Sequence, residues 1–320
     1  MQPTAFLIFG GCVGGRFVVK YREKGGRAVR FAEKHPMSMI VLGVLGISLS
    51  SIFVKYSAAP SAVTAAWRLL WTVLLLTPVA VGSAAHRRSW RQVSRRSALL
   101  SAVSGLFLAL HFVLWFESLH HTSVASSTTI VCTEVIWVCL GYCLFLKGRV
   151  SLKAVAAIAV TLTGSALIAW ADSADGGQLY GDILALLAAV AVAVYTLLGR
   201  VVRATLSTTV YTTMVYAVCA AVLVIACLVQ GQGLFAYGLS PLWVGLLLAV
   251  FSTILGHSVF SWCLRFFSPS FVSASKLCEP VAAALLAVPL FGEIPAPLQL
   301  VGGGLILGGV LWYSRLESKG

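Results

Sequence analysis

Apolar residues run along this chain in stretches of about twenty, separated by short polar, glycine- or proline-containing segments. A helix of about 20 apolar residues spans the roughly 30 Å hydrocarbon core of a bilayer. The connections between the stretches are too short to hold a separate soluble domain. The pattern therefore predicts an all-α polytopic membrane protein with about ten transmembrane helices, at approximately 38–57, 63–82, 97–118, 124–146, 151–171, 180–200, 208–230, 241–264, 270–291 and 297–314.

Composition supports a membrane protein and excludes two other classes. Of the 320 residues 59% are hydrophobic and 10% charged, and the mean hydropathy is +0.94. Ordinary soluble domains carry about 25% charged residues. A soluble enzyme and a nucleic-acid-binding protein are thereby excluded, so no nucleic-acid partner is expected. Seven of the eight cysteines lie inside apolar stretches without CxxC spacing, which predicts neither disulfides nor a structural zinc.

The net charge of +13 follows from membrane topology. With the amino terminus inside, 20 of the 23 Lys and Arg residues fall on one side of the membrane, and the other three (Lys55, Arg68 and Lys276) lie within predicted helices. Basic residues near helix ends are retained on the cytoplasmic side. Both termini are therefore expected in the cytoplasm, with the protein in a plasma or inner membrane.

Residues 1–36 do not have the order of a secretory signal, because their apolar run precedes the basic residues. We interpret them as a basic cytoplasmic extension. The alternative is that the natural start is Met37 or Met39, and either start leaves the orientation unchanged.

The chain contains an internal repeat at a shift of 145 residues. At this shift Cys132-Thr133-Glu134 aligns with Leu277-Cys278-Glu279, and Gly164 aligns with Gly309. Five helices in each half make the second copy cross the bilayer in the opposite sense, as in transporters built from inverted repeats. We therefore expect two inverted five-helix repeats, 37–171 and 172–320.

Three segments resemble the EamA branch of the drug/metabolite transporter superfamily: Ala65-Ala66-Trp67-Arg68, Val113–Leu119 ahead of Ser123–Ser126, and Ser273–Pro280 leading to Gly292-Glu293. The resemblance covers about 37–315. It implies a secondary exporter of amino acids, other metabolites or drugs, with the substrate path between the two repeats. The first repeat departs from the pattern, with Val135 in place of the expected proline and Gly148 in place of the expected glutamate.

Charged residues at membrane depth are the leading candidates for a substrate or coupling site, because a charge there costs about 2.5 to 3.5 kcal/mol and needs a partner. Lys276 and Glu279 are three residues apart on one predicted helix and can pair with each other. Either the pair is structural, or Lys276 meets a substrate carboxylate and Glu279 exchanges a proton. Glu134 has no basic neighbour on its own helix, so burial favours its protonated form unless Arg68 or Lys276 approaches it.

Other candidates have weaker sequence signals. Arg68 can pair with Glu117 near the outer ends of their helices, as an outer gate, or serve as a structural arginine. His111 and His257 lie near the middle of their helices, either in the cavity or bonded to a neighbouring helix. Trp115, Trp137 and Trp262 can line an aromatic wall or pack helices. The spacing of Glu117, His120 and His121 does not make a metal site.

The last predicted helix holds Gly302, Gly303, Gly304, Gly308 and Gly309. Such small residues permit close packing, within the chain or across a homodimer.

The function expected is secondary transport of a small-molecule substrate, without a cofactor and without catalysis. No Walker loop, HExxH or GxSxG is present, which disfavours ATP-driven transport and hydrolysis. A membrane-embedded enzyme using Glu117, His120 and His121, an importer or facilitator, and a channel are the alternatives.

Overall fold

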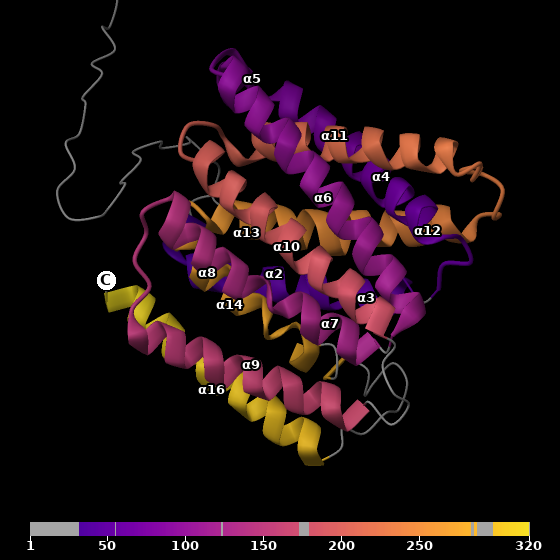
Figure 1. The fold of residues 1–320 in the computed structure, drawn as a ribbon. Coiled ribbons are helices and arrows are strands. Elements are labelled where there is room, and N and C mark those ends of the chain that lie inside the picture. The colour runs from indigo at the N-terminus through magenta and orange to yellow at the C-terminus, as the bar shows by residue number, and fades with distance from the viewer. Residues whose placement is uncertain are drawn as a thin grey trace, which may run out of the picture.

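The computed structural model describes residues 32–54, 56–122, 124–172, 179–282, 285–286 and 297–319, and these form helices and short connections without a strand. Figure 1 shows long helices packed side by side. Helices satisfy every backbone hydrogen bond within one segment, which is what an apolar chain in lipid requires. The predicted helical membrane architecture is confirmed for this part of the chain.

The first half begins with two short helices in one crossing and ends with a long peripheral helix. Its elements are α2 (Pro36–Ser48), α3 (Ser50–Val54), α4 (Ser61–Gly82), α5 (Ala84–Arg91), α6 (Arg95–His121), α7 (Val124–Cys132), α8 (Glu134–Phe145) and α9 (Leu152–Asp172).

The second half begins instead with one continuous helix and also ends with a long helix. Its elements are α10 (Leu179–Val202), α11 (Thr208–Val229), α12 (Ser240–Leu247), the π-helix η1 (Leu248–Ser258), α13 (Val259–Cys263), α14 (Pro269–Lys276) and α16 (Pro297–Lys319).

Eight helices among the described residues are long and apolar enough to cross a membrane, and Leu152–Ile168 forms a shorter apolar helix. These nine correspond to nine of the predicted spans. The remaining prediction, 270–291, falls partly outside the described residues, as do Lys55, Ser123, Gly292 and Glu293 and most of the predicted extension 1–36.

Local sequence signals explain where several helices begin. Ser94 forms a capping box at the start of α6, and Ser207 and Ser268 accept hydrogen bonds from the first turns of α11 and α14. Pro36 and Pro269 occupy first-turn positions, where the missing N–H costs nothing.

The helices around the centre of the molecule are interrupted, a feature that the predicted spans 38–57 and 124–146 did not include. The first crossing breaks at Leu49 and the fourth at Thr133, whose hydroxyl donates to the Ile130 carbonyl at 2.6 Å. Such a side-chain bond competes with the helical ladder. Helix α14 ends at Lys276 because Pro280 lacks an N–H and would clash with the Lys276 carbonyl in a continuous helix.

Two of these breaks are equivalent in the repeat. Thr133 aligns with Cys278, and helical structure resumes in both copies at a glutamate, Glu134 and Glu279. Packing follows the same symmetry: α6 packs on α10, and its counterparts η1 and α13 pack on α2. The pairs α4 with α11 and α9 with α16 each join equivalent helices of the two halves. Helix α8 packs on α14, which is the counterpart of α7, so the equivalent fourth and ninth crossings also meet. This exchange of partners is what a pseudo-two-fold axis in the membrane plane produces.

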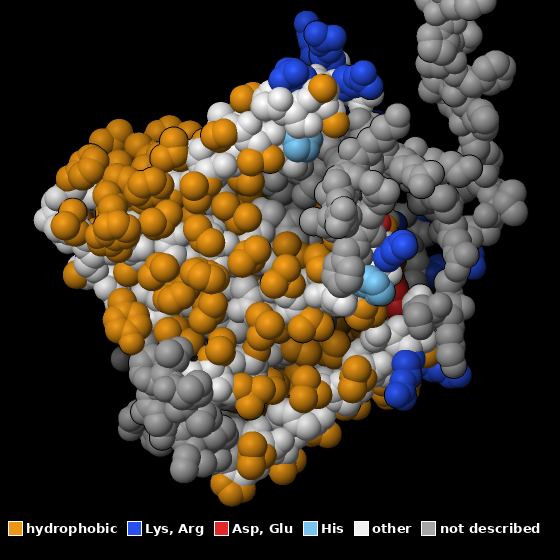
Figure 2. All heavy atoms as spheres, turned by 180° about the vertical axis from the view of Figure 1, so that it is seen from behind, with side chains coloured by type: hydrophobic (Ala, Val, Ile, Leu, Met, Phe, Trp, Pro, Cys, Tyr) orange, Lys and Arg blue, Asp and Glu red, His pale blue; other side chains and the backbone are white. Residues whose placement is uncertain are grey.

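Much of the outer surface is apolar, as lipid contact requires. Figure 2 shows hydrophobic side chains over most of one face, with the Lys and Arg side chains of that view at its top and along its right edge. Exposed side chains include Leu74, Phe145, Trp170, Leu228 and Leu311. The chain is therefore a multi-pass membrane protein.

Glycines allow α9 and α16 to approach closely. A Cβ on Gly164 would lie 2.5 Å from the Gly302 carbonyl oxygen, and one on Gly309 would lie 2.9 Å from the Ala157 carbonyl oxygen. Gly304 and Gly308 face open space, with nothing within 4 Å of such a Cβ. Packing within the chain thus accounts for Gly302 and Gly309, while a homodimer through the other face of α16 stays a prediction.

The contrast between neighbouring glycines is testable. We expect Gly309→Ala to destabilise the protein by about 1 to 3 kcal/mol, because the added methyl overpacks the contact with α9. Gly308→Ala, the matched control, should leave stability unchanged or raise it, since alanine favours helix. Thermal unfolding of both variants in detergent measures the difference. Equal destabilisation would contradict the packing described.

Candidate functional site

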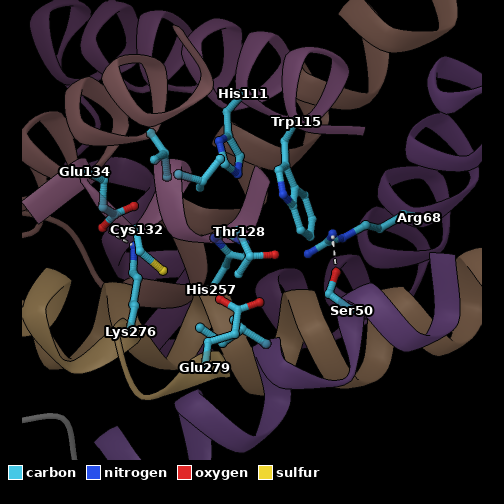
Figure 3. A pocket seen from close by; sticks show the side chains of 13 residues that line it. Ser50, Arg68, His111, Trp115, Thr128, Cys132, Glu134, His257, Lys276 and Glu279 are labelled. Atoms are coloured by element: carbon cyan, nitrogen blue, oxygen red, sulfur yellow. Dashed lines mark hydrogen bonds and ion pairs between the residues drawn. The ribbon is translucent and has the colours of Figure 1, made fainter. Parts of the chain in front are cut away.

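A cavity lies between the two repeats, where the interrupted helices meet. Its volume is about 50 Å³, which is space for a few water molecules. Both halves contribute to its wall, through α2, α3, α4, α6, α7 and α8 on one side and α10, η1, α14 and Glu279 on the other (Figure 3). The lining residues are Ile47, Ser50, Arg68, His111, Trp115, Thr128, Val131, Cys132, Glu134, Val192, His257, Lys276 and Glu279.

Most of the residues singled out from the sequence meet in this cavity. Those that line it are Arg68, His111, Trp115, Glu134, His257, Lys276 and Glu279. Two do not. Glu117 is 3.3 Å from His121 in a half-exposed pair at the end of α6, and Trp262 packs on Phe266 with ring centroids 4.5 Å apart.

The closest charged contact in the cavity joins Lys276 and Glu134. The Lys276 Nζ donates to the Glu134 Oε1 at 2.8 Å, and both side chains are at least nine-tenths buried. This contact corrects the expected pairing of Lys276 with Glu279, because α14 ends at Lys276 and the turn at Leu277 and Cys278 separates the two residues. Of the two partners considered for Glu134, Lys276 is the one that approaches it.

Helix ends support this ion pair electrostatically. Glu134 begins α8 and Lys276 ends α14. The N-terminal end of a helix carries partial positive charge and the C-terminal end partial negative charge. Each charged side chain therefore lies at the helix end of opposite sign.

Arg68 is 1% exposed and is held by hydroxyl groups. Its Nε donates to the Thr253 Oγ1 at 2.7 Å and its Nη1 to the Ser50 Oγ at 3.4 Å. The guanidinium carbon lies 4.3 Å from the centre of the Phe112 ring, a cation–π contact. The expected contact with Glu117 is wrong, because Arg68 turns inward to the cavity while Glu117 pairs with His121.

Glu279 supplies the second carboxylate of the cavity. It begins the helical segment after the turn at Leu277 and Cys278, and among described residues it forms no ion pair. Figure 3 shows its carboxylate pointing into the cavity between the Glu134–Lys276 pair and Arg68. The equivalent glutamates of the two repeats thus have different environments, one paired and one open.

Aromatic and imidazole rings form the remaining wall. The His111 Nδ1 donates to the Ala188 carbonyl at 3.0 Å, which in a neutral imidazole leaves Nε2 as an acceptor. His111 stacks on Trp115, with ring centroids 6.1 Å apart, and lies 6.5 Å from His257. The two placements considered for His111 were in the cavity or hydrogen-bonded to a neighbouring helix. The structure shows both, because His111 bonds to α10 and lines the cavity.

The sequence did not point to six of the lining residues: the apolar Ile47, Val131 and Val192, and Ser50, Thr128 and Cys132, which carry hydroxyl or thiol groups. It also did not point to the hydroxyl of Thr253 that holds Arg68. Serine and threonine are common in transmembrane helices, where they satisfy backbone carbonyls. Their only signal was proximity in sequence to the helix breaks, which the apolar pattern did not reveal.

Comparisons with known proteins agree with this architecture. A model of the EamA-like transporter family matches residues 36–170 and 179–315, one stretch for each five-helix half. A solved structure described as "Crystal structure of protein" has a TM-score of 0.74 at 16% identity, covering 89% of this chain and 98% of its own. At this identity the likeness concerns the fold alone. None of the curated proteins matches the chain.

Removing one partner of the ion pair should be costly, and removing both should not. We expect Lys276→Met to destabilise the protein by about 3 to 5 kcal/mol, since it leaves the Glu134 carboxylate buried without its partner. Combining it with Glu134→Gln should recover most of that loss, because no uncompensated charge remains. Unfolding of the single and double variants in detergent measures the coupling. A double variant as unstable as Lys276→Met would contradict the pairing.

Proposed function

The chain belongs to the EamA-like transporter family, and on this premise we propose that it is a secondary active transporter that exports a small organic metabolite by alternating access. One observation carries this proposal: a cavity lined by both repeats holds two cations and two carboxylates, and three of these four groups (Glu134, Lys276 and Glu279) lie where helices are interrupted. Transporters built from inverted repeats bind their substrates at such a place. Amino acids and related compounds are the substrates that the family resemblance favours.

Contacts at two equivalent loops supply candidate gates. At the α13–α14 connection, Arg200 donates to the Leu264 and Phe267 carbonyls, and the Ser268 hydroxyl donates to Glu317 at 3.0 Å. The α6–α7 connection is its counterpart in the first repeat and is tied by Thr122, which donates to Asp182 at 2.8 Å. Because the repeats are inverted, these loops lie toward opposite ends of the molecule. Alternating access would release one set of contacts while the other holds.

Coupling to an ion gradient would use the unequal carboxylates. Lys276 bonds to Glu134, and Glu279 lies in the same cavity without an ion pair to a described residue. A proton or a substrate cation taken up by Glu279 would change the charge balance that Lys276 experiences. In this scheme Glu279 is the group that binds the coupling ion. Lys276 is the charged group whose electrostatic environment changes when that ion binds.

The orientation proposed has both termini in the cytoplasm of a cell with the protein in its plasma or inner membrane, as the distribution of basic residues favours. Transport without catalysis is the function proposed. The enzyme alternative depends on His120 and His121, which lie outside the cavity, and an importer or facilitator would use the same cavity in another direction.

Extracellular metabolite profiling tests export. Cells that overproduce the protein should accumulate one class of compound outside, and Lys276→Ala and Glu279→Gln should lower that accumulation at least about tenfold at equal membrane abundance, since each removes a charge from the cavity. The matched control is Glu117→Gln, which removes a carboxylate outside the cavity and should export normally. Replacing His120 and His121 should also leave export intact.

Two results would contradict the proposal. Identical profiles with and without the protein under all loading conditions would reject export. Loss of activity on replacing His120 and His121, with the cavity variants active, would favour the enzyme alternative.

A further inference from the structure

Three side chains of the cavity can only donate hydrogen bonds: Lys276, Arg68 and Trp115. Lys276 bonds to Glu134, but Arg68 and Trp115 donate to no negatively charged acceptor among the described residues. The guanidinium of Arg68 has five N–H donors and no acceptor. Its hydrogen bonds go to the neutral hydroxyls of Thr253 and Ser50, and it forms no ion pair within the described residues. The Glu279 carboxylate lies in the same cavity but forms no ion pair with Arg68. A buried charge without a directly bonded counter-charge is costly, which makes an anion that bonds to the guanidinium its natural partner.

Trp115 is the second donor. Its side chain is 6% exposed, and its buried Nε1–H has no hydrogen-bond partner among the residues that the structure describes. Within the described part of the chain, the Thr128 hydroxyl on α7 and the His257 Nδ1 on η1 are likewise buried without partners, and both residues line the same cavity. Native proteins rarely leave buried polar groups unpaired. Unpaired groups from three different helices around one cavity therefore indicate a missing ligand.

These side chains lie around the same cavity. Figure 3 shows the Trp115 indole beside the Arg68 guanidinium, with the indole nitrogen turned to the cavity and the Thr128 hydroxyl pointing toward Arg68. Ser50 holds the guanidinium from the other side, and Thr253 holds its Nε. The arginine is thereby fixed by hydroxyls that do not neutralise it.

We propose that Arg68, Trp115 and Thr128 form a subsite that binds the carboxylate group of the transported compound. This inference rests on the proposed transport function and assigns the end of the cavity that recognises the anion. It replaces the expectation that Lys276 meets a substrate carboxylate, because Glu134 already bonds to Lys276 at 2.8 Å. Arg68 is the cavity cation without such a partner.

The chemistry favours a carboxylate over a phosphate. A guanidinium presents parallel N–H donors that match the two oxygens of a carboxylate. A phosphate dianion needs more positive charge than one arginine supplies, and the second cation of the cavity is neutralised by Glu134. Glu279, which points into the same cavity, repels a second negative charge and favours a positively charged group at the other end of the ligand.

Ligand-dependent stability of the purified full-length protein tests the subsite without requiring transport. The probes are sodium butyrate, its neutral isostere butyramide, L-2-aminobutyrate and n-butylamine, with sodium chloride at equal ionic strength. A ligand that binds the folded protein raises its unfolding midpoint. Butyrate and L-2-aminobutyrate should raise the midpoint, and butyramide, butylamine and sodium chloride should not.

Variants connect the shift to the named residues. Arg68→Gln should weaken the apparent affinity for butyrate at least about tenfold, as expected on losing a charge-assisted bidentate contact. Arg91→Gln removes an exposed arginine of α5 and is the matched control. If Arg68→Gln does not fold, Arg68→Lys and Trp115→Phe serve in its place: the first keeps the charge without the fork, the second removes one N–H, and both should weaken butyrate binding several-fold.

Three results would overturn the subsite: equal stabilisation by butyrate and butyramide, no shift with either carboxylate, or full butyrate binding by the Arg68 and Trp115 variants. Its failure is distinguishable from failure of the proposed function. Butyrate binding through Arg68 in a protein that exports nothing would reject transport alone, and export of compounds that lack a carboxylate would reject the subsite alone.

Discussion

The ion pair between Lys276 and Glu134 is the contact on which the centre of this molecule depends. Each charge alone would be costly at membrane depth, so the pair must form if either residue is to be buried there. It joins α14 to α8, which belong to the ninth and fourth crossings, and these are the two equivalent helices that break in the repeat. The same contact therefore joins the two halves and forms one end of the cavity.

Symmetry provides the framework, and departures from symmetry provide the chemistry. Both copies carry a glutamate after a break, but the shift of 145 residues places Val131 opposite Lys276 and Thr213 opposite Arg68. The two cations of the cavity thus have no counterparts in the other repeat. A symmetric pair of carboxylates becomes one paired and one open group, which gives the cavity two electrostatically different ends.

The helix breaks have different causes in the two halves. In the second half Pro280 ends α14, and in the first half Val135 takes the equivalent position and the Thr133 hydroxyl bonds to its own helix instead. The π-helix η1 occurs in the second half alone among the described residues, and its Thr253 holds Arg68. Irregular backbone is tolerated at membrane depth where it lines a cavity. All of these interruptions lie beside the cavity between the two repeats.

The sequence by itself determined the membrane architecture, the repeat and seven of the thirteen residues that line the cavity. Hydropathy and charge are properties of short segments, so they can be read without knowing which helices touch. Tertiary structure alone decided the partners: Lys276 with Glu134 instead of Glu279, and Arg68 with hydroxyls instead of Glu117. Those choices depend on where helices break and how they rotate against one another, and long-range packing sets both.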